Sequence, residues 1–114
     1  MISMSTHILD TAHGRPAANV SVVLEQPYAD GWREMARRAT DADGRISDLT
    51  PSGASLPAGD YRLRFATADY FRAHGIDEFF YTEVTITIRL AEGGGHYHVP
   101  LLLSPFGYST YRGS

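Results

Sequence analysis

Short stretches in which apolar and polar residues alternate constrain this fold more than any other feature. In TEVTITIRL, residues 82–90, four apolar side chains alternate with threonine and arginine. A period of two places those apolar side chains on one face of a β-strand. Each such stretch therefore predicts a strand with one buried face. The same alternation runs through NVSVVLEQ (19–26), GDYRLRFAT (59–67) and HYHVPLLLS (96–104).

Turn-forming residues separate these stretches at short intervals. THIL (6–9), WREMARRAT (32–40) and GYSTYRG (107–113) are weaker strand candidates. TADYFRAHG (67–75) alone favours a helix, with Thr67 as its N-cap and Gly75 just past its end. Many short strands with regular turns predict an all-β sandwich or barrel, of about eight strands and one short helix.

Length and composition limit the class of protein further. The 114 residues predict a single domain spanning residues 1–114. The sequence contains no apolar run long enough to span a membrane, and its first residues lack the pattern of a signal peptide. It also contains no cysteine, which fits a reducing compartment. We therefore expect a cytoplasmic protein with no membrane partner.

The charge balance excludes two further kinds of chemistry. The formal net charge is −3, whereas nucleic-acid binders present a basic face. All ten basic residues are arginine, so chemistry that depends on a lysine amine is absent. We expect no nucleic-acid partner.

The stretch HYHVP contains two histidines on one face of its predicted strand. His96 and His98 would lie about 7 Å apart, on the face opposite the apolar one. They could bind zinc if His7 supplied a third ligand, or they could be solvated side chains without a ligand. Pro100 cannot donate a backbone hydrogen bond, so its strand either lies at an edge or bends there.

Two other candidate residues are weak signals when taken alone. In TDADGRI, Asp43-Gly44 is a tight-turn signal and Arg45 follows it directly. In STHILD, His7 lies on the strand face opposite Ile8. An isolated arginine after a turn is usually a surface residue, and an isolated strand histidine is usually structural.

Taken together and in order, these segments resemble the transthyretin-related 5-hydroxyisourate hydrolase family. The resemblance rests on STHILDTAHGRPAANVSVVLE near the N-terminus, on TDADGRI, and on HYHVPLLLSPFGYSTYRGS at residues 96–114. It covers essentially the whole chain. Its most specific element is YRGS, residues 111–114, which separates the family's enzymes from the hormone-carrying transthyretins.

The resemblance implies a transthyretin-like two-sheet sandwich that assembles as a homotetramer, a dimer of dimers, with active sites between the dimers. It implies hydrolysis of 5-hydroxyisourate to 2-oxo-4-hydroxy-4-carboxy-5-ureidoimidazoline in urate degradation, without a metal or other cofactor. Carried over by motif, the catalytic residues are His7, Arg45, His98 and Ser114. The substrate-binding residues are His7, Arg45, Tyr111, Arg112, Gly113 and Ser114.

These residue types suit the opening of a cyclic amide. Histidine transfers protons at neutral pH, so His7 and His98 could divide the base and acid roles in either order. Arg45 is permanently charged and suits a developing oxyanion. Ser114 would orient substrate or water. Adjacent residues of a strand point to opposite faces, so Tyr111 and Arg112 can both face the groove only if the strand twists or ends there. The alternative for Arg112 is an interface or ion-pair role.

Two other functions fit part of the pattern. A transthyretin-type carrier of small ligands would use the same fold without chemistry, but it would not need His7, Arg45, His98 and YRGS together. The first half also resembles carboxypeptidase regulatory-like domains, which are structural modules of larger proteins. The sequence favours the hydrolase over both.

Overall fold

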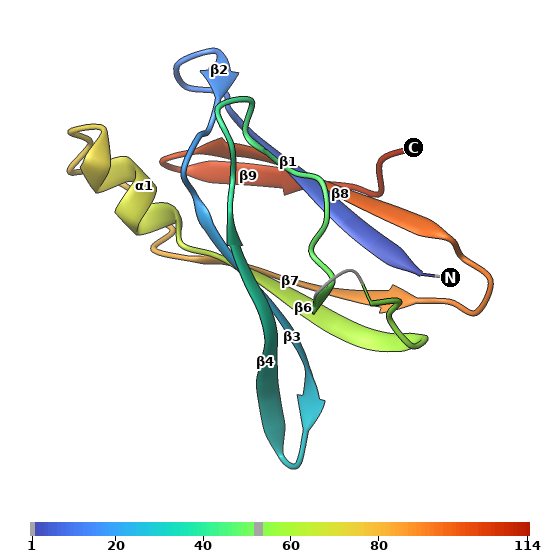
Figure 1. The fold of residues 1–114 in the computed structure, drawn as a ribbon. Coiled ribbons are helices and arrows are strands. Elements are labelled where there is room, and N and C mark those ends of the chain that lie inside the picture. Colours follow the sequence, from blue (N-terminus) through green and yellow to red (C-terminus); the bar gives the residue numbers. More distant parts are fainter. Residues whose placement is uncertain (1, 52–53) are drawn as a thin grey trace.

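The chain folds into two β-sheets that face each other, with one short helix at their side (Figure 1). The computed structural model describes residues 2–51 and 54–114, and over these residues it contains nine strands and one helix. The elements are β1 (Ser3–Asp10), β2 (Arg15–Pro16), β3 (Ser21–Tyr28), β4 (Gly31–Ala39), β5 (Arg45–Ile46), β6 (Gly59–Phe65), α1 (Thr67–Ala73), β7 (Val84–Leu90), β8 (His96–Ser104) and β9 (Gly107–Thr110).

The strand order places the N-terminal strand in the middle of one sheet. That sheet runs β2-β1-β8-β9, and β5 also pairs with β1. The other sheet runs β4-β3-β6-β7. β1 and β8 are parallel, whereas the other pairs are antiparallel. This confirms the predicted all-β sandwich and its long strands, and it adds two two-residue strands, β2 and β5, that the sequence did not reveal.

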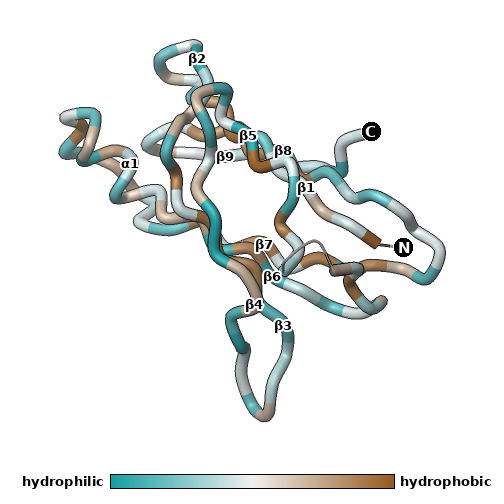
Figure 2. The backbone as a smooth tube through the Cα atoms, viewed as in Figure 1, coloured by the Kyte–Doolittle hydropathy of each residue, from teal (hydrophilic) through white to brown (hydrophobic). Residues whose placement is uncertain are grey.

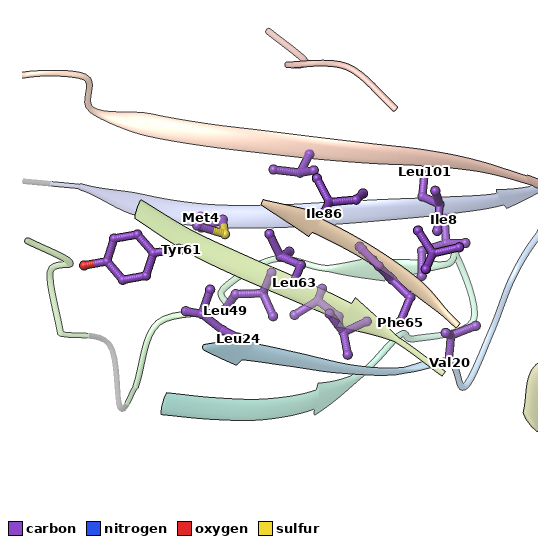
Figure 3. Close-up of a cluster of buried hydrophobic side chains, with 14 of the residues drawn as sticks. Met4, Ile8, Val20, Leu24, Leu49, Tyr61, Leu63, Phe65, Ile86 and Leu101 are labelled. Carbon is purple, nitrogen blue, oxygen red and sulfur yellow. The ribbon is translucent and has the colours of Figure 1, made fainter. Parts of the chain in front are cut away.

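The hydrophobic core lies between the two sheets (Figure 3). Met4 and Ile8 of β1 and Leu101 of β8 point toward Leu63 and Ile86 of the facing sheet. Four of these five side chains have no solvent exposure, and Ile86 is 9% exposed. Burial of each such side chain stabilises the fold by roughly 1.5–3 kcal/mol. Leu63, Ile86 and Leu101 are inward-facing residues that the period-two pattern placed on apolar faces, whereas Met4 lay outside the predicted strands.

β3 departs from the expected half-buried pattern because its second face is also covered. Glu25 was expected to face solvent, yet it is 6% exposed. Arg62 and Arg64 of the neighbouring strand β6 both form ion pairs with its carboxylate. Although burial favours the neutral carboxyl, the hydrogen bonds from these two arginines lower the pKa of Glu25. The outer face of this sheet therefore carries an ionic cluster in which the carboxylate is buried beneath two partly exposed arginines.

The predicted helix is present, but its N-terminal cap was assigned to the wrong residue. The cap position is Ala66, and its side chain has no oxygen with which to cap the helix. Thr67 is already inside the helix, and its hydroxyl donates to the carbonyl of Tyr81 in the following loop at 3.4 Å. Gly75 has a φ of 73°, which confirms its expected place just past the helix.

A buried carboxylate attaches the helix to β1. The Tyr70 hydroxyl donates to Asp10 Oδ2 at 2.6 Å, and His13 Nδ1 lies 2.8 Å from the same oxygen. Burial and the neighbouring Asp10 raise the pKa of Tyr70 to about 12. These contacts fix the C-terminal end of β1, three residues after His7.

The exposed surface is polar over its most projecting part. Figure 2 shows that the β3–β4 hairpin, which extends away from the sandwich, is largely hydrophilic toward its tip. Among residues 2–51 and 54–114, no helix is long and apolar enough to cross a membrane.

Candidate active site

The pairing of β1 with β8 brings a serine and two histidines onto one outer face. Ser5 lies opposite His98 and Ser3 opposite His96 in the parallel register. The Ser5 hydroxyl lies 2.7 Å from His98 Nδ1 and 2.8 Å from His96 Nε2. The predicted common face of the two histidines, opposite the core, is confirmed.

β5 places Arg45 beside His7. The two residues lie directly opposite each other in the antiparallel pairing of β1 and β5, so their side chains share a face. The preceding Gly44 has a φ of 75°, and a Cβ there would lie 2.4 Å from the carbonyl oxygen of Ile8. Only glycine fits this close approach, and the Asp43-Gly44 turn therefore fixes where Arg45 emerges.

A groove of about 330 Å³ opens on this outer face. It contains three of the four expected catalytic residues, Arg45, His98 and Ser114. His7 lies beside it, opposite Arg45. The lining residues are Ser5, Thr6, Arg45, Ile46, Ser47, His96, His98 and Ser114. Four polypeptide segments that are far apart in sequence therefore form one polar concavity.

The surroundings of His98 favour the neutral form of its imidazole. Its ring is half-buried, and burial together with the positive charge of Arg45 lowers its pKa below the ordinary value for histidine. His7 and His96 add smaller contributions in the same direction. Because Nδ1 contacts Ser5, Nε2 remains available to the groove.

His7 has a fixed tautomer when it is neutral. Its Nε2 lies 3.0 Å from the carbonyl oxygen of Asp43. A carbonyl oxygen can only accept a hydrogen bond, so Nε2 carries the proton and Nδ1 holds the lone pair. The tight turn that positions Arg45 therefore also orients His7.

The segment after β9 runs alongside β8 at His98. The Gly113 N–H donates to the His98 carbonyl at 2.7 Å, in a bridge that continues the antiparallel register of β8 and β9. A Cβ on Gly113 would lie 2.6 Å from the imidazole Cδ2 of His98. Glycine is therefore needed here, and it carries the next residue, Ser114, into the groove.

Pro100 explains why this pairing is interrupted. It follows the His98–Gly113 bridge and precedes the regular pairing that begins at Leu101 and Thr110. Having no N–H, it cannot donate to the opposing chain, and its carbonyl instead accepts the Thr110 hydroxyl at 2.7 Å. β8 lies between β1 and β9 and is therefore not the edge strand that Pro100 allowed; the structure accommodates Pro100 by this local break in pairing.

Two expected substrate-binding residues lie elsewhere in the single chain. The Arg112 guanidinium lies 4.1 Å from the centre of the Tyr97 ring. Tyr111 and Arg112 line a separate depression of about 300 Å³ together with residues of β7. The structure therefore brings Ser114, and not Arg112, to the groove beside His98.

The histidines of this face are paired with serines. Among the residues that the structure describes, no group of three or more histidine, cysteine, aspartate or glutamate side chains is arranged to hold a metal ion. His96 and His98 instead share the Ser5 hydroxyl. The zinc site considered from the sequence therefore finds no support in the geometry.

Sequence reasoning missed Ser5 and Ser47 in the groove. Ser5 could have been found, because it lies two residues before His7 and thus on the same strand face. Ser47 follows the two-residue strand β5, and no pattern in the sequence indicated that strand.

Comparison with known proteins agrees with this geometry. The model of the HIUase/Transthyretin family matches residues 4–113. A 5-hydroxyisourate hydrolase of Salmonella dublin is 50% identical over 97% of this chain and 80% of its own length. The structure of Klebsiella pneumoniae 5-hydroxyisourate hydrolase matches with a TM-score of 0.85 and 39% identity, over all of this chain and 94% of that one. Transthyretin from Sparus aurata matches with a TM-score of 0.87 and 38% identity, over 96% and 95%.

The two-sheet sandwich and its match to a solved transthyretin define a transthyretin-like fold. Within that class, the family match extends over nearly the whole chain. This chain belongs to the HIUase/Transthyretin family.

Proposed function

We propose that this chain hydrolyses 5-hydroxyisourate to 2-oxo-4-hydroxy-4-carboxy-5-ureidoimidazoline, a step of urate degradation. The observation that carries the proposal is the groove that joins Arg45, His98 and Ser114. The relatives named 5-hydroxyisourate hydrolase, which reach 50% identity, support the choice of substrate. The absence of cysteine fits a cytoplasmic setting.

His98 is the base in this proposal. Its neutral Nε2 removes a proton from water, and the resulting hydroxide attacks a ring carbonyl of the substrate. The forked guanidinium of Arg45 stabilises the oxyanion that forms. The ring C–N bond then breaks, the nitrogen takes the proton held by His98, and the carbonyl carbon becomes a carboxylic acid that loses its proton to solvent. His7 and Ser114 orient the substrate and the water.

The activity is tested by the ultraviolet absorbance of freshly made 5-hydroxyisourate. Its decay with the protein should be faster than its spontaneous decay. A small-ligand carrier is the alternative, because a structure of sea bream transthyretin in complex with thyroxine matches this chain at 37% identity. Decay at the spontaneous rate, together with stoichiometric ligand binding, would favour the carrier.

The lowered pKa of His98 predicts how the site responds to pH. Histidine is neutral above its pKa, so His98 should remain a base below pH ~6.5, the ordinary value. Activity should fall only as the pH drops through the lowered pKa. Removal of the adjacent positive charge in Arg45→Gln should raise the His98 pKa, as measured by NMR titration of the ring.

A matched control for this titration is Arg37→Gln. Arg37 lies in β4 of the other sheet and forms an exposed ion pair with Glu34. Its replacement should leave the His98 pKa unchanged. A wild-type His98 pKa at or above the ordinary value, or no upward change in Arg45→Gln, would contradict the assigned cause.

The homotetramer is also a proposal. β7 and β9 end their sheets, and the depression between them is lined by Ile86, Ile88, Tyr111 and other residues of both edges. Exposed edge strands readily pair with another copy of the chain. Light scattering during size-exclusion chromatography should give four times the mass of the chain. A monomer at micromolar concentration would overturn the proposal.

A further inference from the structure

A continuous chain of short contacts leads from His98 to the outside of the groove. The Ser5 hydroxyl contacts His98 Nδ1 at 2.7 Å and His96 Nε2 at 2.8 Å. The far ring nitrogen of His96, Nδ1, lies 2.6 Å from the Ser3 hydroxyl. Ser5 is 8% exposed, so water has little access to the middle of this chain.

We propose that Ser5 is a positioning residue that relays a proton between His98 and His96, so that the positive charge created by the base comes to rest on His96. The inference rests on the proposed function, because it adds a second step to the action of the base. His98 then serves as both base and acid.

The protons balance at each step. Before the reaction, His98 Nδ1–H donates to Ser5, Ser5 O–H donates to His96 Nε2, and His96 Nδ1–H donates to Ser3. When His98 Nε2 takes a proton from water, its Nδ1 proton passes to the Ser5 oxygen. The Ser5 proton passes at the same time to His96 Nε2. One proton has left water, His98 is neutral again, and His96 is the imidazolium.

The return step supplies the leaving group. His98 Nε2–H gives its proton to the ring nitrogen as the C–N bond breaks. Ser5 returns a proton to His98 Nδ1, and His96 Nε2 returns one to Ser5. The starting tautomers are restored, and His98 has exchanged no proton with solvent.

Electrostatics favour the charge on His96 over His98. His98 is half-buried and faces Arg45 and His7, and burial with these charges lowers its pKa. His96 is exposed and lies near Asp48. A hydrogen bond from Thr50 lowers the pKa of Asp48, with smaller contributions from the positive charges of Arg38 and His96. The relay thus moves a cation away from Arg45 and toward a carboxylate.

His96 also lies where the groove meets a second depression. That depression, of about 320 Å³, includes Ser3, Asp48 and Thr50 and shares Ser47 and His96 with the groove. The end of the relay therefore opens to this second depression, whose lining does not include Arg45.

Steady-state kinetics with a double-mutant cycle test the relay. Ser5→Ala should lower kcat roughly 10–100-fold with little change in KM. This loss is a part of the roughly 10²–10⁴-fold rate increase that general acid–base catalysis typically supplies. His96 is exposed, so His96→Gln should leave the fold intact, and it should lower kcat by a similar factor. The double variant should have a kcat no lower than that of either single variant, because both substitutions interrupt the same proton path. Ser21→Ala, in β3 of the other sheet, is the matched control and should retain wild-type kcat.

NMR titration of ¹⁵N-labelled histidines tests the relay without substrate. In the wild type, His96 and His98 should titrate together, since a proton shared through Ser5 couples them. In Ser5→Ala only the through-space repulsion between the two rings should remain, so the coupling of their titrations should weaken. Independent titration in the wild type, a wild-type kcat in Ser5→Ala, or additive losses in the double variant would overturn the relay. Absence of wild-type hydrolysis would instead overturn the proposed function while leaving the titration result intact.

Discussion

Replacing His98 with glutamine is expected to lower kcat about 10²–10⁴-fold, the range that a positioned acid–base group supplies. The His98 ring borders the groove with Arg45, and its Nε2 is the nitrogen not engaged by Ser5. Glutamine keeps much of the volume and a polar end, but it cannot take a proton from water at neutral pH. The loss should therefore fall on kcat and leave substrate binding nearly unchanged.

The measurement is the initial rate of absorbance decay of 5-hydroxyisourate, with the spontaneous rate subtracted. His74→Gln is the control histidine, since His74 lies at the end of α1 and is exposed. It should keep wild-type turnover. Thermal unfolding should show that His98→Gln remains folded. A folded His98→Gln protein with wild-type kcat would remove His98 from the catalytic role.

Strand prediction from the sequence succeeded wherever a strand was long enough to show its period. β6, β7 and β8 each bury alternate side chains against the opposite sheet, and their sequences accordingly alternate apolar and polar residues. β2 and β5 contain two residues each and have no period to detect. The buried Glu25 could not be predicted either, because its burial depends on arginines of another strand.

The candidate site was predictable in composition but not in arrangement. The family resemblance supplied His7, Arg45, His98 and the YRGS segment, and alternation along β8 placed His96 and His98 on one face. The contact of Ser5 with both histidines depends on the parallel register of β1 and β8, which joins residues more than 90 positions apart. No local pattern encodes such a register. The stacking of Arg112 on Tyr97 is likewise a tertiary contact.

Removing residues 111–114 is expected to lower kcat by about 10²-fold or more, since small displacements of catalytic groups have effects of this size. The deletion removes the Gly113 hydrogen bond that ties the tail to the His98 carbonyl. It also removes Ser114 from the groove. Stability should change little, because the side chains of Tyr111, Arg112 and Ser114 are exposed. The deletion should therefore lower turnover strongly while changing the melting temperature little.

Ser114→Ala separates the two contributions of the tail. It removes one hydroxyl and keeps the Gly113 bridge to His98, so its loss should be smaller than that of the deletion. If Ser114 orients water or substrate, the variant should still lose turnover measurably, with His98 titrating as in the wild type. If the tail acts only by holding His98, Ser114→Ala should match the wild type while the deletion changes the His98 titration. Full activity of the folded deletion variant would exclude both, because the groove would then function without any contact from the tail.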